Sequence, residues 1–142
     1  MKNIRTMIAV SLLFAATTTV FAQMENRTLM RVSIPFTFNV EDHTLPAGQY
    51  YVRSINPDHS IALVNANSGE SLVITYTPES EGSASQNSRL VFSKYGNQYF
   101  LTQVWTKGDA KARNPWVSKQ AVALARNGVS AEPVIILAYA GK

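Results

Sequence analysis

The sequence predicts an all-β domain, an antiparallel meander of about seven strands that forms a sandwich or a barrel, with one short helix before the last strand. Three observations support this fold class. Apolar residues alternate with polar ones, most clearly between Met30 and Val40. Turns rich in Asn, Gly and Pro separate the alternating segments. A helical period occurs only near residues 117–125. Strands joined by short turns, the last returning beside the first, fold as a sandwich or a barrel.

The first predicted strand spans residues 30–40 and is interrupted by Pro35. Because proline cannot donate a ladder hydrogen bond, we expect this strand at an edge or broken at that residue. The later segments are assigned on the same alternation and on their flanking turns. They comprise strands at 49–55, 60–64, 71–77, 89–94, 99–106 and 134–139, with polar loops at 78–88 and 107–115.

The predicted helix follows the second loop. Val117, Ala121 and Leu124 recur at helical spacing and define one apolar face. Ser118 is suited to cap the start, and the Asn-Gly pair at 127–128 is suited to end the helix.

The alternation also predicts the core, because one face of each strand should be apolar and buried. Thirteen side chains meet this condition: Val32, Ile34, Phe36, Phe38, Val52, Leu63, Leu72, Ile74, Leu90, Phe92, Phe100, Val104 and Ile136.

Residues 1–22 are predicted to be a secretory signal peptide. Lys2 and Arg5 precede an uncharged apolar stretch, and Val20-Phe21-Ala22 has small residues where a signal peptidase cleaves. A membrane-spanning helix is the alternative, and the threonines at 17–19 weaken it. We therefore expect an exported protein, periplasmic or secreted, whose single β-rich domain spans residues 23–142 and carries no membrane anchor after cleavage.

Composition excludes several classes of function. There is no cysteine, so disulfide frameworks, thiolate metal sites and cysteine nucleophiles are absent. Without Lys2 and Arg5, eleven basic residues oppose nine acidic ones, so the predicted domain is nearly neutral. A nucleic-acid-binding domain normally has a basic face, and none is evident in the sequence. We therefore expect no nucleic-acid partner.

Candidate catalytic groups are sparse. His43 and His59 fall in turns at opposite ends of one predicted strand, which separates them too widely to share a metal or a catalytic centre. Glu79 and Glu81 share a polar loop, where solvated carboxylates are the simpler interpretation. We expect no catalytic residue, no cofactor and no metal. The alternatives are a small extracytoplasmic hydrolase or isomerase that uses the loop carboxylates, and a barrel that binds an apolar small molecule.

Several short motifs occur in a characteristic order. They are Ile34-Pro-Phe-x-Phe38, Leu45-Pro-Ala-Gly-x-Tyr50, Val104-Trp-Thr106 and a Ser118-Lys119 pair that opens the helix. In these motifs the chain resembles a group of small secreted bacterial proteins of uncharacterised function. The resemblance implies export and a β-rich fold, and it implies no catalytic residue.

We predict a non-enzymatic binding or structural module. In a simple meander, long loops meet at one end of the sheet, and such loops often carry binding residues. The candidate binding surface consists of Asp58, His59, Glu79, Glu81, Lys107, Lys111, Arg113 and Trp116. A glycan or an envelope protein is the candidate partner. Aromatic residues suited to a sugar-binding face, or alternatively to packing, are Tyr50, Tyr51, Tyr95, Tyr99, Trp105 and Trp116.

Overall fold

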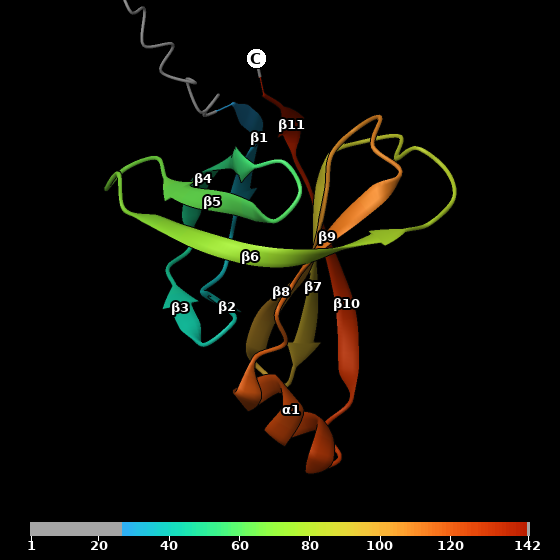
Figure 1. Cartoon of the computed structure of the whole chain (residues 1–142). Coiled ribbons are helices and arrows are strands. Elements are labelled where there is room, and N and C mark those ends of the chain that lie inside the picture. The colour runs from blue at the N-terminus through green and yellow to red at the C-terminus, as the bar shows by residue number, and fades with distance from the viewer. Residues whose placement is uncertain (1–26, 142) are drawn as a thin grey trace, which may run out of the picture.

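The computed structural model describes residues 27–141, which contain eleven strands and one helix (Figure 1). The predicted signal peptide, residues 1–22, lies outside the described residues. The elements are β1 (Thr28–Ile34), β2 (Phe38–Val40), β3 (His43–Leu45), β4 (Gly48–Asn56), β5 (Ser60–Asn65), β6 (Ser71–Ser80), β7 (Arg89–Tyr95), β8 (Gln98–Trp105), β9 (Lys111–Pro115), α1 (Lys119–Arg126), β10 (Ala131–Leu137) and β11 (Tyr139–Ala140).

The strands form one open mixed sheet in the order β10-β7-β8-β9-β6-β5-β4-β1-β11. Strand β2 pairs with β3 and, in parallel, with β8, where Asn39 lies opposite Phe100. The all-β prediction is confirmed, as is the single helix before the last strands. The structure supports neither the seven-strand meander nor a closed barrel. Strand β9 lies between β6 and β8, so β6 does not pair with the strand that follows it.

Strand β6 runs through both halves of the sheet. Its first half pairs with β5, with Thr75 opposite Ser60, and its second half pairs with β9, with Tyr76 opposite Pro115. Figure 1 shows β6 crossing the whole width of the molecule. This single strand therefore joins the half built around β1, β4 and β5 to the half built around β7, β8 and β9.

The last strands connect the two ends of the sheet. Strand β10 pairs with β7 and β11 pairs with β1, and only Ala138 separates them in the chain. The Ala138 backbone N–H donates to the Ser88 carbonyl at 2.9 Å. No ladder joins β10 to β1 in the described part of the chain, so the sheet stays open. Of the last two strands, only β11 therefore lies beside the first strand, β1.

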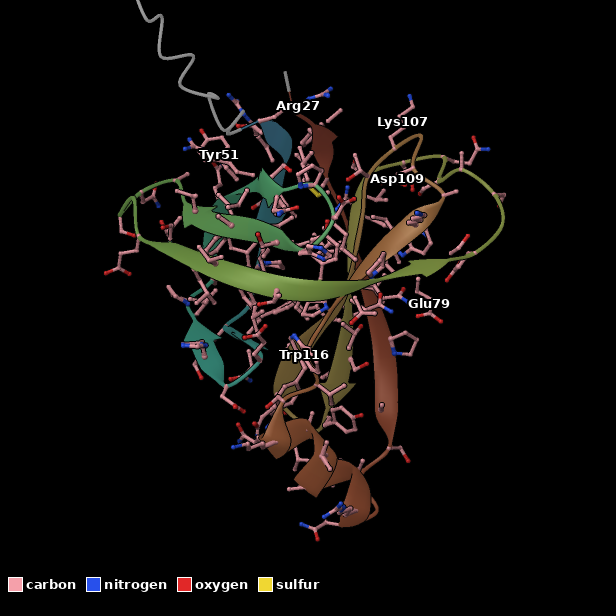
Figure 2. All side chains as sticks on the ribbon, in the orientation of Figure 1. Arg27, Tyr51, Glu79, Lys107, Asp109 and Trp116 are labelled. Carbon is pink, nitrogen blue, oxygen red and sulfur yellow. The ribbon has the colours of Figure 1, made fainter. Side chains whose placement is uncertain are left out.

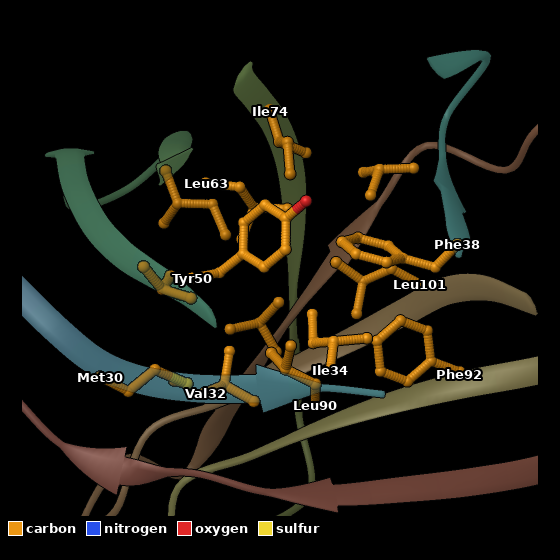
Figure 3. Packing of buried hydrophobic residues seen from close by; sticks show 14 of the residues in the cluster. Met30, Val32, Ile34, Phe38, Tyr50, Leu63, Ile74, Leu90, Phe92 and Leu101 are labelled. Atoms are coloured by element: carbon orange, nitrogen blue, oxygen red, sulfur yellow. The ribbon is translucent and has the colours of Figure 1, made fainter. Parts of the chain in front are cut away.

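The core follows the predicted alternation closely. Ten of the thirteen predicted side chains are buried, and Phe36, Leu72 and Ile136 are half-buried and pack against the others (Figure 3). Phe38 is 0% exposed, and its ring contacts Tyr50 and Phe92 edge-on, with centroids 5.3 and 5.6 Å away. The strand containing Phe36 and Phe38 breaks between residues 35 and 37, as Pro35 predicts.

Helix α1 begins as the sequence predicts. The Ser118 hydroxyl caps it by accepting from the Gln120 N–H at 3.2 Å. The Asp42 carboxylate, in the turn between β2 and β3, accepts from the preceding backbone N–H, that of Lys119, also at 3.2 Å. This contact joins the β2–β3 hairpin to the start of the helix, and residues of both line a hollow that is described below.

Candidate functional site

The structure divides the predicted binding surface into separate places. Four of its residues line a shallow pocket of about 150 Å³, together with Tyr76 and Asp109. We call it the His59 pocket; the four predicted residues are Asp58, His59, Lys111 and Arg113. Glu81 and Lys107 are exposed on the neighbouring loops and do not line it. The long loops do meet, because the Ser85 N–H donates to the Asp109 carbonyl at 2.9 Å.

Trp116 does not lie with these residues: it lines a different hollow, and β9 separates it from the long loops. Residues 111–115 form β9, which is extended and spans about 15 Å. Trp116 follows the far end of that strand, beside the start of α1, whereas Lys107 and Asp109 precede its near end (Figure 2). The sequence prediction missed β9 because Lys-Ala-Arg-Asn-Pro shows no apolar alternation.

One charged pair in the His59 pocket is satisfied, that of Arg113 and Asp109. Arg113 forms an ion pair with Asp109 at 3.1 Å and donates to the Thr106 hydroxyl at 3.0 Å. Its guanidinium also lies 5.7 Å from the centre of the Tyr76 ring, and the Tyr76 hydroxyl donates to the Pro57 carbonyl. The pocket is small, and its arginine is already engaged on three sides, by Asp109, Thr106 and Tyr76. Its residues are better explained as fastening the β4–β5 turn to β9.

The two predicted loop carboxylates differ in role. Glu79 lies in β6, and its carboxylate accepts from the Asn114 side-chain amide on β9. Glu81 lies just beyond the strand, where its backbone N–H donates to the Ala110 carbonyl at 3.1 Å and its side chain is exposed. Glu79 therefore links β6 to β9 through a side-chain hydrogen bond. The same bond orients Asn114, which lines a second hollow.

This second hollow, of about 310 Å³, has Trp116 on its rim, and we call it the Trp116 groove. Three segments build its walls: the β2–β3 turn with Glu41, the β7–β8 hairpin with Tyr95, and the end of β9 with Asn114 together with the following link to α1, which holds Trp116. The indole of Trp116 is 65% exposed and the neighbouring Val117 is 74% exposed. An apolar surface of this kind within a concave site is typical of ligand-binding pockets.

Two acceptor atoms in this groove lack a partner. Glu41 Oε1 and Asn114 Oδ1 are buried, and neither has a hydrogen-bond partner within residues 27–141. Leaving a buried acceptor unpaired costs about 1–3 kcal/mol. Both residues line the same hollow, and because both atoms are closed to solvent, a bound molecule with two donor groups could pair them only after the two side chains turned toward it.

Glu41 is held in an unusual conformation. It is the one residue other than glycine with positive φ in the described part of the chain, at 53°. Such a conformation costs about 1 kcal/mol or more in a residue with a Cβ, and it tends to occur at functional sites. Burial raises the pKa of the Glu41 carboxyl, and nearby Asp42 adds to this, while His43 opposes it. A strained, partly desolvated carboxyl at the edge of a groove fits a binding role.

The sequence identified Trp116 and Tyr95 as potential sugar-binding aromatics, and both line the groove. Of the other aromatics in that set, Tyr50 and Trp105 are buried in the interior. Glu41 and Asn114 were missed. They lie in a turn and in the unrecognised strand β9, and nothing in their local sequence indicates that the two segments meet.

His43 and His59 line different hollows, and no group of three or more His, Asp or Glu side chains within residues 27–141 is placed to hold a metal ion. Nor does that part of the chain contain a helix long and apolar enough to cross a membrane.

Comparison with known proteins assigns no family. No family model matches the chain, and neither a curated protein nor a solved structure is significantly similar to it. The resemblance to small secreted bacterial proteins therefore remains a prediction.

Proposed function

We propose that this protein is an exported, non-enzymatic domain that binds a glycan in the Trp116 groove. The observation that carries the proposal is an exposed indole in a hollow whose lining includes Glu41 and Asn114, two residues that each hold a buried side-chain oxygen without a partner. The signal-peptide features of residues 1–22 support export. The glycan would then be one met outside the cytoplasm.

A pyranose ring matches these groups. Its hydroxyls donate hydrogen bonds, as the carboxylate and the amide oxygen require. Its C–H face is apolar and can lie against an aromatic ring such as Trp116. The groove volume of about 310 Å³ is at the low end of the range for small-molecule sites, which suits one sugar unit or the end of a chain.

The carboxyl content of the groove favours binding over hydrolysis. Glycoside hydrolysis normally uses two carboxyl groups on either side of the bond. Glu41 is the one carboxylate among the residues that line the described groove. The adjacent Asp42 is engaged with the backbone of α1 through the Lys119 N–H. The alternative enzyme that uses Glu79 and Glu81 gains no support from the Glu79–Asn114 contact.

The proposal is tested by screening the protein on an array of pyranose oligosaccharides that includes N-acetylglucosamine oligomers. The strongest hit is then titrated by calorimetry against wild type, Trp116→Ala and Glu41→Gln. We expect saturable binding that both substitutions weaken. Tyr139→Ala is the matched control, because Tyr139 is an 81% exposed aromatic that lies outside the Trp116 groove. Absence of any saccharide hit, or equal binding by Trp116→Ala, would contradict the proposal.

A further inference from the structure

A second group of aromatic and basic residues lies on the outer face of β1, β4 and β11, away from the Trp116 groove. The strand register places Arg31 of β1 directly between Tyr51 of β4 and Tyr139 of β11. The Arg31 guanidinium lies 5.2 Å from the centre of the Tyr51 ring. Stacking on an aromatic ring limits the motion of the guanidinium while leaving its N–H groups free to donate.

Arg53 approaches the same ring from along β4, with its guanidinium 6.0 Å from the Tyr51 centroid. Its Nε atom is buried and has no hydrogen-bond partner within the described residues. Two guanidinium groups therefore share one tyrosine. Like charges held this close repel each other, and a bound anion would relieve the repulsion.

Within residues 27–141, no ion pair offsets the charges of Arg31 and Arg53. The one ion pair in the described part of the chain joins Arg113 to Asp109, on the His59 pocket. Beside Arg31 lies a hollow of about 220 Å³ whose lining includes Ser33, Gln49 and Tyr139 but no acidic residue. The Ser33 hydroxyl and the Gln49 amide can both donate. The hollow thus offers hydrogen-bond donors and positive charge.

We propose that this hollow, the Arg31 site, binds the phosphate group of a phosphorylated ligand. Arg31 would hold two phosphate oxygens with its paired N–H groups, and Arg53 would add positive potential on the far side of Tyr51. A phosphate monoester carries nearly two negative charges at neutral pH, which suits two arginines better than a carboxylate does. The hollow also leaves room for an attached group against Tyr139. The site is independent of the proposed glycan groove.

A phosphate group of this kind could belong to a soluble phosphosugar or to a lipid headgroup. The test therefore uses three probes with the full-length protein: glucose 6-phosphate, inorganic phosphate, and vesicles of phosphatidic acid, a phosphate monoester, in phosphatidylcholine. Calorimetry reports the soluble probes and co-sedimentation reports the vesicles. Saturable binding to any of the three supports the proposal, and the pattern among them identifies the source of the phosphate.

The variants follow from the geometry. Arg31→Gln should weaken binding of the active probe about tenfold or more, because it removes the bidentate donor. Arg31→Lys should restore only part of the affinity, since an amine lacks the planar pair of donors. Arg53→Gln should have a smaller effect. Arg126→Gln is the matched control, because Arg126 is exposed in the last turn of α1 and lies outside the site.

Equal binding by Arg31→Gln and Arg126→Gln would overturn the proposal, as would binding to none of the three probes. Folding of each variant is checked by its thermal midpoint, which should match wild type because Arg31 is exposed. Trp116→Ala should retain wild-type binding to the phosphate probe. Loss of glycan binding and loss of phosphate binding are therefore separable results.

Discussion

The Trp116 groove and the Arg31 site differ in the hydrogen-bonding groups that they leave free. The groove offers acceptors, Glu41 Oε1 and Asn114 Oδ1, beside an exposed indole. The Arg31 site offers donors and positive charge beside two tyrosines. Both contain aromatic rings, so aromatic content alone does not distinguish their ligands. What distinguishes the ligands is whether the unpaired groups are donors or acceptors, because a ligand must supply the complementary groups.

The two sites also differ in how they are built. The Arg31 site lies on adjacent strands of one ladder, so its geometry follows from register alone. The Trp116 groove depends on a tertiary contact, the Asp42 cap on α1, which brings the β2–β3 turn to the helix. We therefore expect the groove to be the more sensitive of the two to mutation at a distance.

The largest expected effect concerns the core that both sites share. Phe38→Ala should lower the free energy of unfolding by about 3–5 kcal/mol, because Phe38 is fully buried. Phe38 contacts Tyr50, which also lines the Arg31 site, so both sites should be lost together on heating. Urea denaturation measures the change. Phe36→Ala is the control and should cost less, since Phe36 is only half-buried.

A substitution at the rim should separate binding from stability. Trp116→Ala should weaken glycan binding about tenfold while changing the unfolding free energy by less than about 0.5 kcal/mol, because the indole is largely exposed. Calorimetric titration and urea denaturation of the same preparation give both numbers. A large loss of stability in this variant would mean that Trp116 acts in packing.

Glu41→Gly should make the protein more stable and weaken glycan binding. Glycine accepts φ of 53° without strain, so we expect a gain of about 0.5–1 kcal/mol in unfolding free energy. Glu41→Gln retains the strain and is the matched control for the backbone effect. If Glu41→Gly were less stable than wild type, the strain at this residue would not be real.

The smallest effect is a pH dependence. The raised pKa of Glu41 means that the folded protein holds this proton more tightly than the unfolded chain. Stability from this group is therefore present at low pH and is lost as pH rises from the ordinary glutamate pKa, about 4.3, through the raised folded value. Urea midpoints across this window should fall more in wild type than in Glu41→Gln. Identical profiles would contradict a desolvated Glu41.

Much of the fold was predictable, because burial of one strand face imposes a period of two. Residues such as Val32, Ile34 and Phe38 follow it and are buried. Strand β9 was not predictable in this way, since of its residues only Ala112 and Pro115 are buried and the rest is polar. Missing it also gave the wrong strand order, because β9 occupies the place beside β6 that a meander assigns to the next strand.

The proposed glycan groove could be predicted from the sequence only in part. Trp116 was recognised as exposed, but it was grouped with loops that β9 separates from it. Glu41 gave no sequence signal, because positive φ is expected at Gly, Asn or Asp and seldom at glutamate. Its meeting with Asn114 depends on the packing of α1 and the β2–β3 turn, which no local pattern encodes.

The most direct test of glycan binding in the Trp116 groove is a crossed titration. The strongest saccharide from the array is titrated into wild type, Trp116→Ala and Arg31→Gln under one set of conditions. The account predicts that affinity falls about tenfold in Trp116→Ala and stays at the wild-type value in Arg31→Gln. Wild-type affinity in Trp116→Ala, with or without a loss in Arg31→Gln, would contradict it.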